Sequence, residues 1–204
     1  MALSNYTELK ARIEGLSKRN DLGTNIDTFI DLAEADMWQK LKVREMESRA
    51  TATVSTTTRF LSLPDDFLRM RKLVLISGNN HYPLNFSNPE SLQVQAGAGR
   101  PKAFTVSSEL EFDRIPDSAY TAEMHYYKDV PALDATNSTN DLLTNYPAVY
   151  LYGAMFHYAQ WAHDDRMLLQ YSELFDEVMN RANKVARKAR HGPAPYMRAE
   201  GSTP

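Results

Sequence analysis

The 204-residue sequence contains no cysteine. This absence excludes disulfide frameworks, thiolate metal sites and cysteine nucleophiles, and it fits a reducing compartment. The sequence also lacks a marked excess of charge of either sign, since 23 lysines and arginines oppose 26 aspartates and glutamates. The whole chain is therefore neither a polycation for nucleic acid nor an acidic solvating tail. Any electrostatic role must come from local clusters of charge.

Long apolar runs are missing as well. No stretch approaches the ~20 consecutive apolar residues that span a bilayer. The first ten residues alternate polar and apolar side chains and lack the apolar core of a signal peptide. We therefore expect a soluble protein that is made in the cytoplasm and does not associate with membranes.

The common catalytic and ligand-binding motifs are also absent. No G-x-S-x-G, G-x-x-x-x-G-K-[ST] or G-x-G-x-x-G sequence is present. The glycine-rich stretch 97–101 precedes a predicted strand, whereas a phosphate cradle precedes a helix. His157 and His163 are six residues apart, or ~600° of helical rotation, so their side chains would point to opposite sides. We predict no catalytic residue, no cofactor site and no metal site, and hence a protein that is not an enzyme.

Two amphipathic helices are predicted near the N-terminus. Apolar residues recur every three or four positions over 6–16 and again over 26–41. The second segment also carries the carboxylates Asp27, Asp31, Glu34 and Asp36. An acid/base pair needs two carboxyl groups in different environments, whereas these residues scatter over one arc, so we interpret them as a solvated face.

The middle of the chain has the composition of a sheet. Residues 50–58 are rich in Thr, Val and Ser, which favour extended chain. Gly78–Asn80 is typical of a hairpin turn, and side chains alternate between polar and apolar over 82–86 and 120–127. The pattern predicts five to seven antiparallel strands.

The last third is predicted to be helical again. A polar connection over 130–144 is near the upper limit for a structureless loop, so we expect a partner to order it. The segment from Pro147 is apolar on most sides, as a buried central helix is. A second, longer helix follows with a near-heptad spacing of apolar residues. This spacing predicts a buried seam of Met167, Tyr171, Leu174, Val178, Ala182, Val185 and Ala189.

The predicted fold class is α+β, with an N-terminal helical hairpin, a small antiparallel β domain, and a long C-terminal helical pair ending in a flexible tail. We expect the N-terminal helices to pack with the C-terminal pair. The predicted boundaries are 1–47 for the N-terminal helices, 48–130 for the β-rich middle, 131–145 for the polar loop, 146–191 for the helical pair and 192–204 for the tail.

Two surface features stand out in the C-terminal helices. The basic end of the last helix extends over nearly three turns, which is longer than complementarity to the helix dipole requires. We predict that it contacts a partner through Arg181, Lys184, Arg187, Lys188 and Arg190. The tyrosines fit either core packing or contacts between subunits, because tyrosine suits surfaces that are half apolar and half wet. The candidate subunit contacts are Asp27, Asp31, Glu34, Tyr146, Tyr150 and Tyr152.

Four stretches in this order resemble the head-to-tail adaptor (head-completion) proteins of short-tailed bacteriophages. They lie at Phe29–Ala35, Leu63–Leu68, Gly99–Phe104, and Tyr126–Leu133 with Asn140–Leu143 and Tyr146–Ala154. The resemblance covers residues 6–190. It implies a ring, commonly of twelve copies, in the virion neck beneath the portal. Such a ring would extend the DNA channel, let DNA slide through without sequence-specific binding, and support tail or nozzle proteins. The resemblance brings no catalytic residues.

Three other functions remain open from the sequence. The chain fits another phage neck or tail assembly subunit with a different stoichiometry. It also fits a DNA-binding factor that uses the basic helix end, whose affinity would fall steeply with salt. An enzyme is the last alternative, although no motif supports it.

Overall fold

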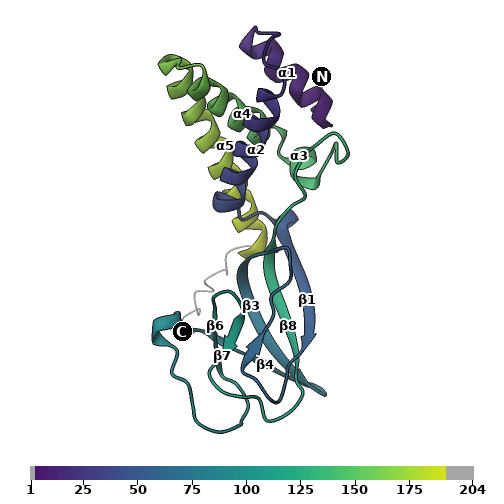
Figure 1. Cartoon of the computed structure of the whole chain (residues 1–204), viewed down its shortest axis with the longest axis vertical. Coiled ribbons are helices and arrows are strands. Elements are labelled where there is room, and N and C mark those ends of the chain that lie inside the picture. Colours follow the sequence, from purple (N-terminus) through teal and green to yellow (C-terminus); the bar gives the residue numbers. More distant parts are fainter. Residues whose placement is uncertain (1–2, 192–204) are drawn as a thin grey trace, which may run out of the picture. The chain divides into compact units, whose positions relative to one another are not determined.

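The computed structural model describes residues 3–191, and these residues form five α-helices and eight strands (Figure 1). They divide into two compact units. The helical unit takes residues up to 44 and from 132 onward, and the β unit is Glu45–Pro131. The predicted α+β class is confirmed. No helix within residues 3–191 is long and apolar enough to cross a membrane. The predicted tail, 192–204, lies outside the described residues.

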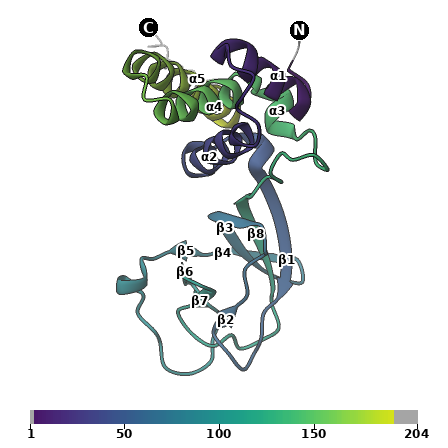
Figure 2. The same ribbon diagram turned by 45° about the horizontal axis from the view of Figure 1, so that its top comes forward.

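The helical unit is organised around one central helix. Its helices are α1 (Tyr6–Ser17), α2 (Asn25–Lys40), α3 (Asp141–Asn145), α4 (Pro147–Trp161) and α5 (Asp165–His191). Helix α4 packs against all four others, and Figure 2 shows it next to α5 and α2. It is the most apolar of the helices and begins with Pro147, whose missing N–H costs nothing at a helix start. The prediction of a buried central helix is confirmed.

Gly153 sets how closely these helices approach. A Cβ atom built on Gly153 would lie 2.8 Å from the Cβ of Ala33 in α2 and 2.9 Å from Cε2 of Phe175 in α5. Real Cβ atoms do not come so close to other heavy atoms, so only glycine fits at this position. The buried faces of α2 and α5 therefore meet α4 at its one glycine.

The predicted seam of α5 is right at Ala182 and wrong at most of its other positions. The buried residues of this helix are Phe175, Met179, Ala182 and Ala186. Leu174 and Val178, from the predicted seam, are only half-buried, and Val185 is 57% exposed. The true face lies about one residue farther along the helix, because Phe175 fills the space that Gly153 leaves open.

The β unit contains two four-stranded sheets. Its strands are β1 (Glu47–Thr53), β2 (Phe60–Leu61), β3 (Phe67–Ser77), β4 (Asn80–Pro83), β5 (Asn85–Phe86), β6 (Ala103–Val106), β7 (Leu110–Phe112) and β8 (Thr121–Lys128). The orders are β1-β8-β3-β4 and β2-β7-β6-β5. All pairs are antiparallel except β5 with β6, which is parallel. The predicted small antiparallel β domain is confirmed, with β5 and β6 as one parallel pair that the sequence pattern did not indicate.

The core of the β unit lies between the two sheets. Ala122, Met124 and Tyr126 of β8 point into it, as their alternation in the sequence predicts. The other sheet contributes Phe104 and Phe112. Period-two alternation places one side of β8 in this core.

The connection at 131–145 differs from the loop that the sequence predicts. Its last residues form α3, which Asn140 caps by accepting a hydrogen bond from the backbone N–H of Leu143 at 2.8 Å. The backbone N–H of Tyr6 donates to the carbonyl of Ser138 at 2.7 Å. Leu133 is buried. The segment is thus held by its own helical unit and does not require a partner to order it.

Candidate functional site

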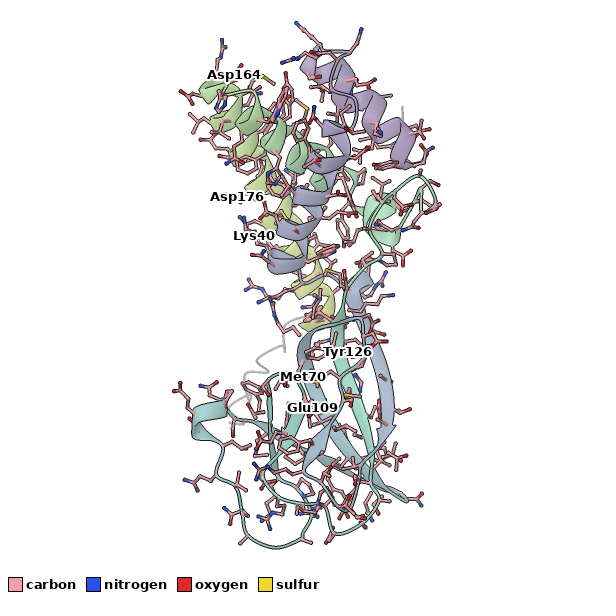
Figure 3. All side chains as sticks on the ribbon, in the orientation of Figure 1. Lys40, Met70, Glu109, Tyr126, Asp164 and Asp176 are labelled. Carbon is pink, nitrogen blue, oxygen red and sulfur yellow. The ribbon has the colours of Figure 1, made fainter. Side chains whose placement is uncertain are left out.

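A basic groove lies between the end of α2 and the second half of α5. It encloses about 560 Å³. Its lining consists of Lys40, Lys42, Asn180, Asn183, Lys184, Arg187 and Arg190. Five of these seven residues are cationic and none is acidic. Figure 3 labels Lys40 at the end of α2, beside α5.

Asn183 holds the two sides of this groove together. Its side-chain amide donates to the carbonyl of Lys40 at 3.0 Å, and its Oδ1 accepts from the backbone N–H of Lys42 at 2.7 Å. Arg190 donates to the carbonyl of Lys42. The bond to Lys40 satisfies a carbonyl that the end of α2 leaves without a helical partner, and the other two bonds hold the backbone of Lys42 just beyond it. They also fix two lysines of the α2 end beside the cations of α5.

The five predicted partner contacts lie in two places in the structure, inside and outside the lining of the basic groove. Lys184, Arg187 and Arg190 line the basic groove, whereas Lys188 is exposed outside its lining. Arg181 pairs with Glu177 one turn earlier, with 2.5 Å between Nη2 and Oε1. Sequence reasoning missed Lys40 and Lys42. The available signal was a basic residue in the last turn of α2, but its neighbour in space is more than 140 positions away in sequence.

A second, apolar groove lies between α5 and the start of α4, and encloses about 200 Å³. Its lining from α4 and the residues before it is Asn145–Val149. Its lining from α5 is Val178, Arg181, Ala182 and Val185. Val185, which is 57% exposed, is the valine of this lining that is open to solvent.

The predicted subunit contacts fall into two groups. Tyr146 lines the apolar groove, and Tyr152 packs on Tyr171 with 6.3 Å between ring centroids. Asp31 is exposed. Asp27 is half-buried and lies 2.6 Å from both Nζ of Lys10 and the hydroxyl of Tyr6. These four residues keep side-chain surface that a neighbouring subunit can reach.

Glu34 and Tyr150 correct the interpretation of the acidic arc as a solvated face. Both are about 1% exposed, so neither offers surface to a neighbour. Oε1 of Glu34 accepts hydrogen bonds from the hydroxyl of Tyr150 and from the backbone N–H of Leu133, each at 3.0 Å. Burial raises the pKa of the Tyr150 hydroxyl, and the negative charge of Glu34 raises this pKa further. This site therefore stabilises the fold and holds the 131–145 segment.

Residues from the first and the last matching stretches of the resemblance meet at this buried carboxylate. Glu34 belongs to the first matching stretch, and Leu133, Asn140 and Tyr150 belong to the last. The amide of Asn140 donates to the Tyr150 hydroxyl at 2.8 Å. The motif pattern thus has a structural cause, since its polar residues satisfy one another inside the helical unit.

Charged residues also cluster in the β unit, around a hollow of about 210 Å³. There Arg71 pairs with Glu47, and Nε2 of His125 lies 2.8 Å from Glu123. Arg71 and Glu47 come from β3 and β1, the two strands on either side of β8, whereas His125 and Glu123 both belong to β8. These contacts hold charged side chains together within one sheet. Among residues 3–191, no three His, Cys, Asp or Glu side chains are grouped so as to hold a metal ion.

The chain was compared with known proteins. A family model described as SU10 adaptor protein matches residues 4–197, which is nearly the whole chain. A search of curated proteins finds no match.

Proposed function

Because this chain belongs to the SU10 adaptor protein family, a family of phage head–tail adaptors, we propose that it forms a dodecameric ring that joins the portal to the tail and extends the DNA channel. The family supports a structural role in the virion neck, in association with other virion proteins such as portal and tail. The observation that carries the proposal is the family match over residues 4–197.

A ring places two different surfaces of each subunit in contact. The two grooves of the helical unit supply surfaces of different chemistry, one apolar and one basic. In the proposed ring the apolar groove, with Tyr146 at its edge, receives the neighbouring subunit. Tyr152, Asp27 and Asp31 belong to the same set of proposed subunit contacts. Val185 is the residue best placed to test this, because it is both exposed and part of the apolar lining.

The basic end of α5 is the proposed contact with the portal. It consists of Arg181, Lys184, Arg187, Lys188 and Arg190. A net charge of only −3 on the chain supports a channel wall that lets DNA pass without gripping it. Replacing Lys184, Arg187 and Lys188 together with alanine should leave the fold intact and weaken assembly on the portal.

Electron microscopy of the purified chain with its portal tests the proposal directly. A closed ring at the portal is expected, and a chain that stays monomeric in its presence would contradict it. Val185→Asp should abolish the ring without unfolding the helix. Leu169→Asp is the matched control, because Leu169 is 65% exposed on the same helix and lies outside both groove linings. Mass measurement of the assembly distinguishes a dodecamer from a neck or tail subunit of another stoichiometry.

Binding of DNA is the second candidate function, and the cations of the basic end favour it. In that case affinity for duplex DNA falls steeply as salt rises, and each groove cation contributes to the slope. Affinity that is weak at physiological salt and independent of these cations would eliminate this candidate.

A further inference from the structure

Charge is segregated along α5. Between Asp165 and Glu177 the helix carries four carboxylates and one cation, and between Arg181 and Arg190 it carries five cations and no carboxylate. Attraction between a helix dipole and charged side chains reaches only the first and last turns. The pattern extends over the whole helix, so the dipole does not account for it.

The acidic half lies on the same side of α5 as the basic groove. Asp176 precedes Asn183 by seven residues and Glu173 precedes Asn180 by seven, which is close to two full turns. Both asparagines line the groove, and both acidic residues are exposed. The basic surface is therefore bordered along the helix by negative charge, with Lys40 and Asp176 on neighbouring helices (Figure 3).

The negative charge of Glu173 and Asp176 beside the basic groove limits which anions can bind there. Duplex DNA carries a charge every ~1.7 Å along its axis, so a duplex lying along α5 would place phosphates against Glu173 and Asp176. A short anionic segment, by contrast, would end within the basic groove and contact only the cations that line it. The groove volume of about 560 Å³ is that of a site for a few residues.

We infer that the basic groove binds a short acidic segment of another polypeptide, with its carboxylates facing Lys40, Lys42, Lys184 and Arg187. The inference rests on the proposed function, in which a different virion protein meets this end of the helical unit. Lysine and arginine at fixed positions around a small volume give charge complementarity, which sets partner choice and association rate. Asn180 adds a side-chain amide that can bind a backbone group of the segment.

A short fluorescent poly-glutamate peptide, added to the full-length chain, is the probe. Lys184→Glu and Arg187→Glu should each weaken peptide binding about tenfold or more, because each replaces an attraction inside the groove with a repulsion. Arg166→Glu and Arg12→Glu are the matched controls, since they change the net charge equally, are exposed, and lie outside both groove linings and outside the basic end of α5. Binding to the controls should stay within about twofold of the original chain. Circular dichroism confirms that all four variants fold.

Two results would overturn the inference. Equal losses in all four variants would mean that the peptide responds only to the net charge of the chain. A duplex that displaces the peptide, and whose own affinity depends on Lys184 and Arg187, would assign the groove to nucleic acid. Microscopy of the original chain with portal reports separately on the ring. Loss of the ring with peptide binding intact removes the proposed function, whereas a ring with no groove-dependent peptide binding removes the inference.

Discussion

The hydroxyl of Tyr150 donates a hydrogen bond to Oε1 of Glu34 across 3.0 Å inside the helical unit. The same oxygen accepts from the backbone N–H of Leu133. One buried carboxylate thus joins α2, α4 and the connection that leads to α3. Burying a carboxylate is costly unless hydrogen bonds compensate it, so each donor around Glu34 contributes to stability.

Tyr150→Phe tests this arrangement. The substitution removes a donor from Glu34 and leaves the side-chain amide of Asn140 without the hydroxyl that accepts its hydrogen bond. We expect the free energy of unfolding to fall by about 1–3 kcal/mol in urea titrations. Tyr152→Phe is the control, because that tyrosine is half-buried on the same helix, and its change should stay within about 0.5 kcal/mol. Equal effects of the two substitutions would contradict the role of the buried network.

Replacing Gly153 and replacing Gly15 with alanine should change the stability of the chain in opposite directions. Alanine at this position places a methyl group within 3 Å of both Ala33 and Phe175, so the helices must move apart. Overpacking of this kind costs about 1–3 kcal/mol. Gly15→Ala in α1 is the matched control, because a Cβ there meets nothing within 4 Å and should stabilise the chain by about 0.5–1 kcal/mol. Thermal unfolding of the two variants should therefore shift in opposite directions.

The two asparagines of the basic groove differ in their bonds. Asn183→Ala removes two hydrogen bonds to the backbone at the end of α2 and should lower the free energy of unfolding by about 1–3 kcal/mol. Asn180 is exposed in the same groove, and its replacement with alanine should cost at most about 0.5 kcal/mol. If chemical unfolding gives the same midpoint for both variants, Asn183 does not hold the α2 end.

The apolar pattern of α5 shows what a sequence can predict and what it cannot. The helix itself follows from the three- and four-residue spacing. Two stripes satisfy that spacing, one through Leu174 and Val178 and the other through Phe175 and Met179. Choosing between them depends on α4, where Gly153 accepts the ring of Phe175. That information lies outside the α5 sequence, so the wrong stripe was predicted.

Hydrogen bonds between polar residues far apart in the sequence are the second feature that the sequence pattern does not predict. Glu34 falls on the acidic arc of α2 in the sequence pattern, and its burial depends on donors more than 90 positions away. Lys40 and Lys42 likewise join the basic groove through Asn183, which is distant in sequence. Three of the five predicted contact cations do line that groove. Local charge patterns therefore located one wall of the site, and tertiary hydrogen bonds determined the other.

Asp27 predicts a dependence of stability on pH. Burial alone would raise the pKa of this carboxyl group, but hydrogen bonds from Lys10 and Tyr6 outweigh it and hold the pKa below the ordinary value of 3.8. The ionised carboxylate therefore stabilises the folded chain above that ordinary value, and this contribution is lost as pH falls through the lower pKa of the folded state. Urea titrations should show Asp27→Asn less stable than the original chain at neutral pH, with the difference closing in acid.

Asp31, one turn later on α2, should show the opposite sign. Asp31 is exposed as a whole residue, but partial desolvation of its carboxyl group, followed by repulsion from Asp27, raises the pKa of this group above 3.8. Folding therefore disfavours its ionised form, and the penalty is complete once pH exceeds the raised pKa. Asp31→Asn should stabilise the chain at neutral pH, and the gain should vanish as pH falls below the ordinary value, where the carboxyl group is protonated in both states. Parallel pH profiles for the two asparagine variants would show that the contacts of Lys10 and Tyr6 do not distinguish these carboxylates.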